Sequence, residues 1–420
     1  MSRELSTEVS TETYKETAEC RTVTETQRMH REARRGGAKD SNSVKPNAPV
    51  HEGLAGVVIA QSEISHVDGE RGTLSYRGYD IGELACHATY EETVYLLWHK
   101  ELPTRDELEA FSNDLKADRD IDDTIWRILA ILPQTVEPMD ALRTTVSALS
   151  CADEDNGDRC LVCNLEKAQR LVAKFPTIVA NYYSYRKNRG RVHPHPELNH
   201  AANFLYMIHG EMPTEMQVRS MDMAMLLMAE HGFNASTFAA RVTAATLSDM
   251  YSAVTTAIGT LKGPLHGGAN RRAMQMMLEI GDIDNVKPYI QDALARKQRI
   301  MGFGHRVYKT APDPRSAYLR GRLYELCAER GDFRYYELAT AIAETMESEK
   351  GLYPNVDFYA APLLYLLGIP LELFVPVFAI SRIPGWTTQV MEQYDHNRLI
   401  RPLSTYVGPD NRSYLPIDAR

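Results

Sequence analysis

ASTFAARVTAATLSDMYSAVTTAIGTL, residues 235–261, is the stretch that most narrows the choice of fold. It is unusually rich in Ala, Ser and Thr, and small side chains let helix axes approach closely. We therefore expect one long central helix of a packed bundle here. Just before it, Met221 to Glu230 is apolar on nearly every face, which is typical of a buried helix. The fold class is expected to be mainly α.

The best candidate for β-structure is Val57 to Arg77, where two strand-like runs flank the glycine-bearing turn DGERG, residues 68–72. This pattern predicts a short N-terminal β-hairpin. After it the pattern is helical, as in Tyr90 to His99, and Thr104 with Glu107 predicts a capping box for the next helix. There is no run of parallel strands and no GxGxxG motif, so a Rossmann domain is not expected.

The chain has 420 residues, of which 44% are hydrophobic and 25% charged, which is ordinary for a globular protein of one larger and one smaller domain. Its net charge of -9 argues against a general nucleic-acid binder, which needs a basic surface. Residues 1–48 are polar and poor in apolar side chains, so we expect a disordered extension and no secretory signal.

The apolar run Ala361 to Ile380 is interrupted by prolines and by Glu372, so we expect packed helices rather than a membrane span. The six cysteines are expected to be reduced thiols in a cytoplasmic protein. Cys160 and Cys163 have CxxC spacing, but no second pair or suitably spaced His follows them. No metal site is expected.

Three segments each place a titratable residue beside Gly or Pro at the boundary of an element, where the backbone can approach a ligand. In KGPLHGGAN, residues 262–270, His266 lies near the start of the next helix, an environment that disfavours imidazolium. In MGFGHRVYKTAPDPR, residues 301–315, glycines precede His305 and cations follow it, which suits an anionic ligand.

In the third segment, YPNVDFYAAP, residues 353–362, Asp357 lies among apolar and aromatic residues. Burial raises the pKa of such a carboxylate unless a cation compensates, and it can then serve as a general base. His231, Arg382 and Arg401 are further candidates, although single arginines are usually surface charges. For all of these segments, a turn histidine, a solvated basic loop, a helix N-cap or a buried ion pair is the structural alternative.

Taken together, the segments resemble the citrate synthase family. The resemblance runs from about Gly53 to Gly408 and includes SYRGYDI, residues 75–81, and PMDALRTTVS, residues 138–147, with every segment in family order. It implies an almost wholly helical fold with a large domain (49–268 and 371–420) and a small domain (269–370) around a cleft. It also implies a homodimer whose active sites are shared between subunits.

The resemblance implies a role for each candidate. Asp357 would be the base that takes a methyl proton from acetyl-CoA, His266 would stabilise the enol or enolate, and His305 would polarise the oxaloacetate ketone. Oxaloacetate would be bound by His231, Arg315, Arg382 and Arg401, the last from the partner subunit, and CoA by the region of Lys262, Gly302, Gly304, Arg306 and Lys309. CoA would be a co-substrate, and no permanent cofactor or metal is implied.

Two departures from the family pattern leave the substrate open. Gln389 stands where many members have His after a similar Trp, and Ile-Pro separates Arg382 from Gly385. We expect condensation of acetyl-CoA with oxaloacetate, with 2-methylcitrate synthase acting on propionyl-CoA as the alternative. A non-catalytic CoA-binding paralogue is a remote alternative, because His266, His305 and Asp357 are all present.

Overall fold

The computed structural model describes residues 50–54 and 56–420, so the extension predicted over residues 1–48 lies outside it. Its contacts divide the chain into two units, Ala60–Ile400 and a second unit of residues 1–59 and 401–420. Among its described residues, the second unit contains the 3-10 turns Glu52–Leu54 and Ile417–Ala419. The division into a large and a small domain stays a prediction.

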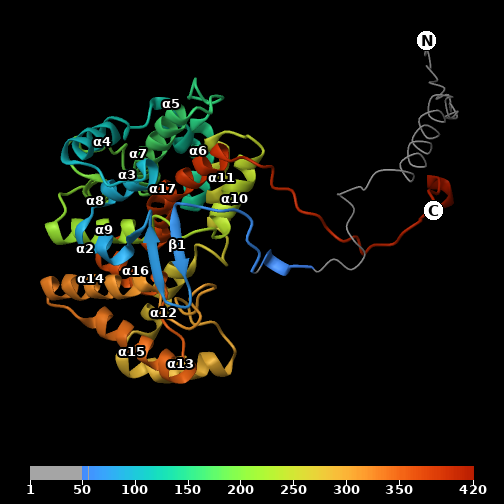
Figure 1. The fold of residues 1–420 in the computed structure, drawn as a ribbon. Helices are drawn as coiled ribbons and strands as arrows, with labels where there is room; N and C mark the ends of the chain where they lie inside the picture. The colour runs from blue at the N-terminus through green and yellow to red at the C-terminus, as the bar shows by residue number, and fades with distance from the viewer. Residues whose placement is uncertain (1–49, 55) are drawn as a thin grey trace, which may run out of the picture. The chain divides into compact units, whose positions relative to one another are not determined.

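The unit Ala60–Ile400 is mainly helical, which confirms the predicted fold class (Figure 1). Its strands are β1 Ser65–Asp68, β2 Thr73–Tyr76 and β3 Tyr79–Asp80. Its helices are α2 Ile81–His87, α3 Tyr90–His99, α4 Arg105–Ala117, α5 Asp123–Ile131, α6 Pro138–Leu149, α7 Leu161–Arg186, α8 His200–His209, α9 Glu215–Met228, α10 Ala235–Ala245, α11 Met250–Leu261, α12 Ala269–Ile280, α13 Val286–Ala295, α14 Pro314–Arg330, α15 Arg334–Lys350, α16 Val356–Leu366 and α17 Phe374–Asp395.

The predicted hairpin is present as β1 and β2, and the short strand β3 extends it into an antiparallel sheet of order β1-β2-β3. In its register Ser65 is opposite Tyr76 and Asp68 is opposite Thr73. Because paired residues in an antiparallel ladder point to the same face of the sheet, the side chains of Ser65 and Tyr76 lie side by side. The predicted capping box between Thr104 and Glu107 is also present, at the start of α4.

The single long helix predicted over residues 235–261 is wrong, because the chain forms two helices, α10 and α11, that pack against each other. Leu247 adopts a left-handed backbone with φ of 62°, which ends α10. The side chain of Asp249 then accepts a hydrogen bond from the Ser252 N–H at 2.9 Å and caps α11. The small residues therefore allow the close approach of two helices of one hairpin, rather than forming one long rod.

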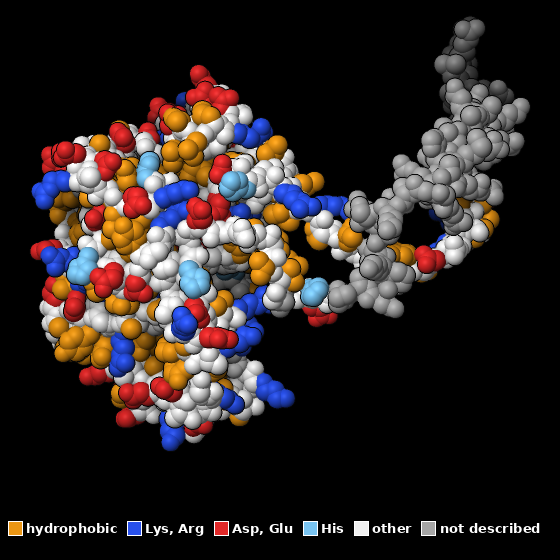
Figure 2. Space-filling model, in the orientation of Figure 1, with side chains coloured by type: hydrophobic (Ala, Val, Ile, Leu, Met, Phe, Trp, Pro, Cys, Tyr) orange, Lys and Arg blue, Asp and Glu red, His pale blue; other side chains and the backbone are white. Residues whose placement is uncertain are grey.

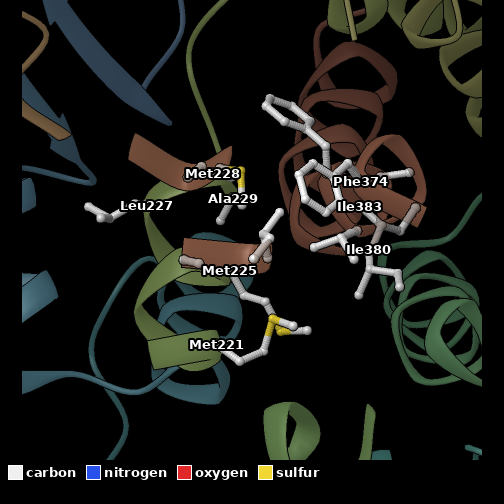
Figure 3. Close-up of a cluster of buried hydrophobic side chains, with 14 of the residues drawn as sticks. Met221, Met225, Leu227, Met228, Ala229, Phe374, Ile380 and Ile383 are labelled. Carbon is white, nitrogen blue, oxygen red and sulfur yellow. The ribbon is translucent and has the colours of Figure 1, made fainter. Parts of the chain in front are cut away.

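One part of the hydrophobic core lies where α9 packs against α17 (Figure 3). Met221, Met225 and Met228 lie on the side of α9 that faces Phe374, Ile380 and Ile383 of α17, and all of them are fully buried. The run Ala361 to Ile380 contains the end of α16 and the start of α17, as expected for packed helices. None of the described helices is both long and apolar enough to cross a bilayer.

The surface of the compact unit carries charges of both signs. Figure 2 shows acidic and basic side chains interspersed over the visible face, without a broad region of either sign.

Candidate active site

Five of the six predicted site residues in the unit Ala60–Ile400 lie at or near the ends of helices, and the sixth, Arg382, lies within a helix. His231 follows α9, His266 lies between α11 and α12, and His305 precedes α14. Arg315 and Asp357 lie in the first turns of α14 and α16, and Arg382 lies within α17. Helix ends suit such a site because their backbone polar groups are free to hold side chains and ligands.

His305 is held as a hydrogen-bond donor. Its Nδ1 accepts hydrogen bonds from the N–H groups of Val307 at 3.0 Å and Tyr308 at 3.2 Å. In a neutral ring the proton is then on Nε2, which can donate to a ligand. Burial, helped by the charge of Arg315, lowers the pKa of His305 to about 4, so the ring stays neutral at physiological pH.

His231 lies against His305, with ring centroids 5.1 Å apart. Its Nε2 lies 3.1 Å from the hydroxyl of Tyr308, a residue that also stacks near His305. Burial and the charge of Arg315 lower the pKa of His231 well below its ordinary value. The two histidines and the tyrosine therefore form one uncharged polar cluster.

The hairpin fixes the backbone on both sides of His231. The Ser65 hydroxyl accepts a hydrogen bond from the Gly232 N–H at 3.2 Å and donates one to Glu230 Oε1 at 3.1 Å. The Tyr76 hydroxyl donates to the Glu230 carbonyl at 2.8 Å and accepts from its N–H at 3.2 Å. Because these two side chains are paired across the ladder, a single point of the sheet clamps the segment that carries His231.

His266 has the opposite tautomer to His305. Its Nε2 accepts from the Ser236 N–H at 3.3 Å and lies 2.8 Å from the Ser236 hydroxyl, so the neutral ring carries its proton on Nδ1. Trp386 Nε1 donates to the same hydroxyl at 3.1 Å, which fixes its position. Burial, with the charge of Arg382, lowers the pKa of His266 to about 4. The pKa of His266 is therefore lowered, as expected, but the causes are burial and the charge of Arg382 rather than the start of the next helix.

The turn before α12 is tight enough to require Gly267. Its N–H donates to the Leu261 carbonyl at 2.9 Å, and a Cβ at this position would lie 2.3 Å from the same oxygen. Any side chain here would push the turn away from α11. The glycine therefore sets the position of the neighbouring His266.

Asp357 is presented by the first turn of α16. Its N–H donates to the capping side chain of Asn355 at 3.1 Å, and the Asn355 amide donates to the Gly304 carbonyl at 3.0 Å. The loop that carries His305 is therefore tied to the helix that carries Asp357. Burial raises the pKa of Asp357 to about 7, although the charge of Arg315 acts in the opposite direction.

Asp313 supports Arg315. It accepts two hydrogen bonds from the guanidinium, at 2.9 and 2.7 Å, and a third from the Val356 N–H at 3.1 Å. Both side chains of this ion pair are almost completely buried. Burial acts against ionisation, but Arg315 outweighs it and lowers the pKa of Asp313. The pair therefore fixes α14 to the start of α16.

Arg382 is held by the end of α9, since its Nε donates to the Met228 carbonyl at 2.6 Å. Burial lowers the pKa of Arg382 to about 10, and the nearby Glu230 carboxylate opposes this shift. Close packing of α17 on α9 is possible because residue 385 is Gly, where a Cβ would lie 2.3 Å from the Ala229 carbonyl oxygen.

Comparison with known proteins is consistent with this geometry. Residues 53–403 match the family model described as "Citrate synthase, C-terminal domain". The chain belongs to the citrate synthase family. It is 50% identical to the citrate synthase of Haloferax volcanii over 375 residues, 88% of this chain and 98% of the relative.

Two further relatives bear on the substrate. The chain is 44% identical to the 2-methylcitrate synthase of Mycobacterium tuberculosis over 370 residues, 88% of this chain and 93% of the relative. It also resembles the crystal structure of the ternary complex of carboxymethyl coenzyme A and oxaloacetate with citrate synthase from Thermoplasma acidophilum. That match has a TM-score of 0.84 and 32% identity and covers 89% of this chain and 100% of the other.

Of the remaining predicted residues, only the two glycines reach the start of α16, where the Gly302 carbonyl accepts from the Asn355 N–H at 2.9 Å and the Gly304 carbonyl accepts from its side-chain amide at 3.0 Å. No described contact brings the other residues to Asp357. Arg401 is exposed and belongs to the second unit of the chain. Lys262 pairs with Asp140 at 2.6 Å, while Arg306 and Lys309 are exposed in the loop after His305. Gly302 and Gly304 have φ values of 84° and 76°, the left-handed backbone that glycine adopts without strain. Their predicted roles toward CoA stay proposals.

Sequence reasoning missed several residues that support the site. Ser236 and Tyr308 lay within the segments already singled out, so their polar groups beside His231 and His305 were a usable signal. Glu230 was also adjacent. The partners of this segment in the hairpin, Ser65 and Tyr76, are 165 and 154 residues distant from Glu230, and no local pattern indicates such contacts.

Gln389, which stands where many members of the citrate synthase family have His, bridges two buried charged side chains. Its amide donates to Glu230 Oε1 at 2.9 Å, and its carbonyl oxygen accepts from Arg241 at 2.8 Å. It therefore joins the buried Glu230 carboxylate to the buried Arg241 guanidinium. Among the residues described, no group of His, Cys, Asp or Glu forms a metal site.

Proposed function

We propose that this chain condenses acetyl-CoA with oxaloacetate and water to give citrate and CoA, through an enol or enolate and citryl-CoA. The observation that carries the proposal is Asp357, a carboxyl group whose pKa burial raises to about 7. Asn355 ties the loop of the neutral His305 to the helix that carries Asp357, and His266 is a second neutral histidine, of the opposite tautomer. A base with this pKa is matched to proton transfer near neutral pH.

The first step is removal of a methyl proton from acetyl-CoA by Asp357. That proton is much less acidic than a carboxylic acid, so the developing charge on the thioester oxygen needs a donor. His266 is suited to this task because its free Nδ1 carries the proton. A neutral imidazole can donate this hydrogen bond without placing a positive charge in the buried site.

The second step joins the enol carbon to the ketone carbon of oxaloacetate. His305 donates a hydrogen bond from Nε2 to the ketone oxygen and stabilises the negative charge that builds up there, and the proton that Asp357 removed from the methyl group balances the proton taken up by the alkoxide. His231, Arg315 and Arg382 bind the oxaloacetate carboxylates, since guanidinium groups pair with carboxylates in two-point contacts. Water then hydrolyses citryl-CoA to citrate and CoA.

The described residues around the site offer little unpaired positive charge to an anionic substrate, which favours a further cation from another subunit. Arg315 is already paired with Asp313, and the field of Arg382 is offset by Glu230. The histidines are neutral, so a dianionic substrate meets little net positive charge from these residues. We infer that Arg401 of a partner subunit completes the site, which makes the working unit a homodimer. We further infer that residues 269–370 close over the substrate as a small domain and exclude water.

The released-thiol assay with acetyl-CoA and oxaloacetate tests the reaction. Asp357→Asn should reduce turnover by several orders of magnitude, about 10³-fold or more, because the asparagine amide cannot accept the methyl proton. The matched control is Asp284→Asn, an exposed aspartate in the turn before α13. Thiol release by Asp357→Asn at a rate near that of the control would remove Asp357 from the role of base.

The alternative substrate is propionyl-CoA, as the printed name of the Mycobacterium tuberculosis relative suggests. The two acyl groups differ by one methylene, which a pocket discriminates by about 10–200-fold. Steady-state kinetics with both acyl-CoAs give the two specificity constants. A higher value for propionyl-CoA would assign the chain to 2-methylcitrate synthesis.

Mixed dimers test the shared site. Arg401→Ala and Asp357→Asn should each be nearly inactive alone, but a heterodimer of the two would contain one intact site. Random mixing in equal amounts should restore about one quarter of the wild-type turnover, because half of the dimers are mixed. If exchange of subunits is demonstrated and no activity returns, Arg401 does not act across the interface.

A further inference from the structure

The CxxC motif of Cys160 and Cys163 lies outside the site and takes no part in the proposed reaction. The expectation that these cysteines are reduced is wrong for the structure, in which they form a disulfide at the start of α7. Cys160 is the N-cap residue of this 26-residue helix, and its sulfur accepts a hydrogen bond from the Cys163 N–H at 3.1 Å. The first sulfur therefore faces the free N–H groups of the helix end.

The disulfide is not needed to hold its surroundings. Lys167 Nζ contacts the carbonyl of Asn156 at 3.3 Å and that of Asp158, and the Asn164 amide donates to the Arg159 carbonyl at 3.1 Å. These contacts fix the preceding loop to α7 from within the helix. A ring this small constrains the unfolded chain only weakly, because the entropy that a disulfide removes falls as the closed loop becomes shorter. Stabilisation of the fold is therefore a poor explanation for the disulfide between Cys160 and Cys163.

The surroundings of the pair favour thiol chemistry. The first turn of α7 contains no acidic residue, so the helix end stabilises a thiolate on Cys160. Cys160 is exposed, and the side chains between the two cysteines, Leu161 and Val162, are 68% and 64% exposed. A reactive sulfur bordered by exposed apolar side chains is accessible to a second thiol-bearing molecule.

We propose that Cys160 and Cys163 form a reversible thiol–disulfide site that exchanges electrons with dithiols. A thiolate of the dithiol attacks the exposed Cys160 sulfur, the sulfur–sulfur bond breaks, and Cys163 leaves as a thiolate that takes up a proton. The second thiol of the reductant then attacks its own sulfur in the mixed disulfide. Cys160 is released as a thiol or thiolate, and the dithiol leaves as a disulfide. Two electrons pass to the protein.

The experiment uses the full native chain in mixtures of reduced and oxidised dithiothreitol. Free thiols are trapped with iodoacetamide, and mass spectrometry measures the linked and alkylated forms of the peptide that carries both cysteines. The linked fraction should follow the ratio of the two reagents while the circular dichroism of the fold stays unchanged. A peptide that stays fully linked or fully reduced in every mixture overturns the proposal, as does exchange seen only after denaturation.

The rate of alkylation supplies an internal control. Cys86 is also exposed but lies in the last turn of α2, so it lacks the free N–H groups that a helix N-terminus offers to a sulfur. In the fully reduced chain at pH 7, Cys160 should react with iodoacetamide about ten-fold faster than Cys86. Cys163→Ser should preserve this fast labelling. Equal rates at the two positions would refute the reasoning. Citrate formation plays no part in either readout, so the result is independent of the proposed function.

Discussion

Replacing Asp357 by Asn should make the protein more stable as well as inactive. The pKa of Asp357 is about 7 in the folded chain, against an ordinary value of 3.8. Since the folded state binds the proton more tightly, this group lowers stability as pH rises from about 4 to 7, and the whole cost is present above pH 7. A difference of about three pKa units corresponds to about 4 kcal/mol at pH 8.

Asparagine keeps the shape of the side chain and removes its charge. The gain in unfolding free energy of Asp357→Asn over the wild type should therefore rise from about 0.5 kcal/mol at pH 4 to about 4 kcal/mol at pH 8. Urea unfolding at pH 4, 6 and 8, followed by tryptophan fluorescence, gives this difference, in which titration of all other groups cancels. Asp284→Asn, at an exposed position, is the matched control.

A gain that is the same at every pH, or a loss of stability at pH 8, would show that Asp357 is not a destabilised carboxylate. The loss of activity and the gain in stability of Asp357→Asn have the same physical cause. The burial that makes Asp357 a suitable base at neutral pH is the same burial that destabilises the folded chain.

Three further predictions follow from the geometry. The logarithm of kcat/KM should fall with a slope of one below pH about 7 as Asp357 takes up a proton, and a rate that stays level down to pH 5 would exclude this carboxyl. Gly385→Ala should cost about 1–3 kcal/mol in urea unfolding, whereas Gly321→Ala, with open space around its Cβ, should cost nothing. Ser65→Ala should raise the KM for oxaloacetate more than it lowers kcat, because Ser65 holds the backbone beside His231. Ser75→Ala, on the opposite face of the hairpin, should change neither constant. Equal effects of the two substitutions would show that Ser65 does not position His231.

Local patterns in the sequence predicted the elements well. The helical class, the hairpin and the capping box of α4 all depend on residues close together in the chain. The prediction of one long helix over residues 235–261 was wrong because it relied on the small-residue composition and not on the helix N-cap signal within the stretch. Asp249, three residues before Ser252, is a helix N-cap, and it divides the stretch.

The candidate site was predicted in part. His266, His305 and Asp357 were chosen because glycine, proline and apolar neighbours mark unusual local environments, which a sequence displays directly. Their protonation could not be derived in the same way. The tautomer of His266 depends on Ser236, 30 residues away, and the pKa of Asp357 depends on burial, which raises it, and on the opposing charges of Arg315 and Arg382 from α14 and α17. Such contacts appear only when distant segments meet. Cytoplasmic location and dimerisation stay predictions.

The hairpin has a consequence for synthesis of the chain. Ser62, just before β1, bonds to Glu392 at 3.2 Å, across 330 residues of sequence. At a translation rate of about 5–20 residues per second, the hairpin leaves the ribosome roughly 15 to 65 s before that partner does. The contacts of Ser65 and Tyr76 with Glu230 can form earlier, after 165 and 154 further residues, but the segment that leads into β1 has no Glu392 to bind throughout this interval. The start of the first strand is thus among the last parts of the unit to be covered, and this is where a chaperone would have most effect on yield.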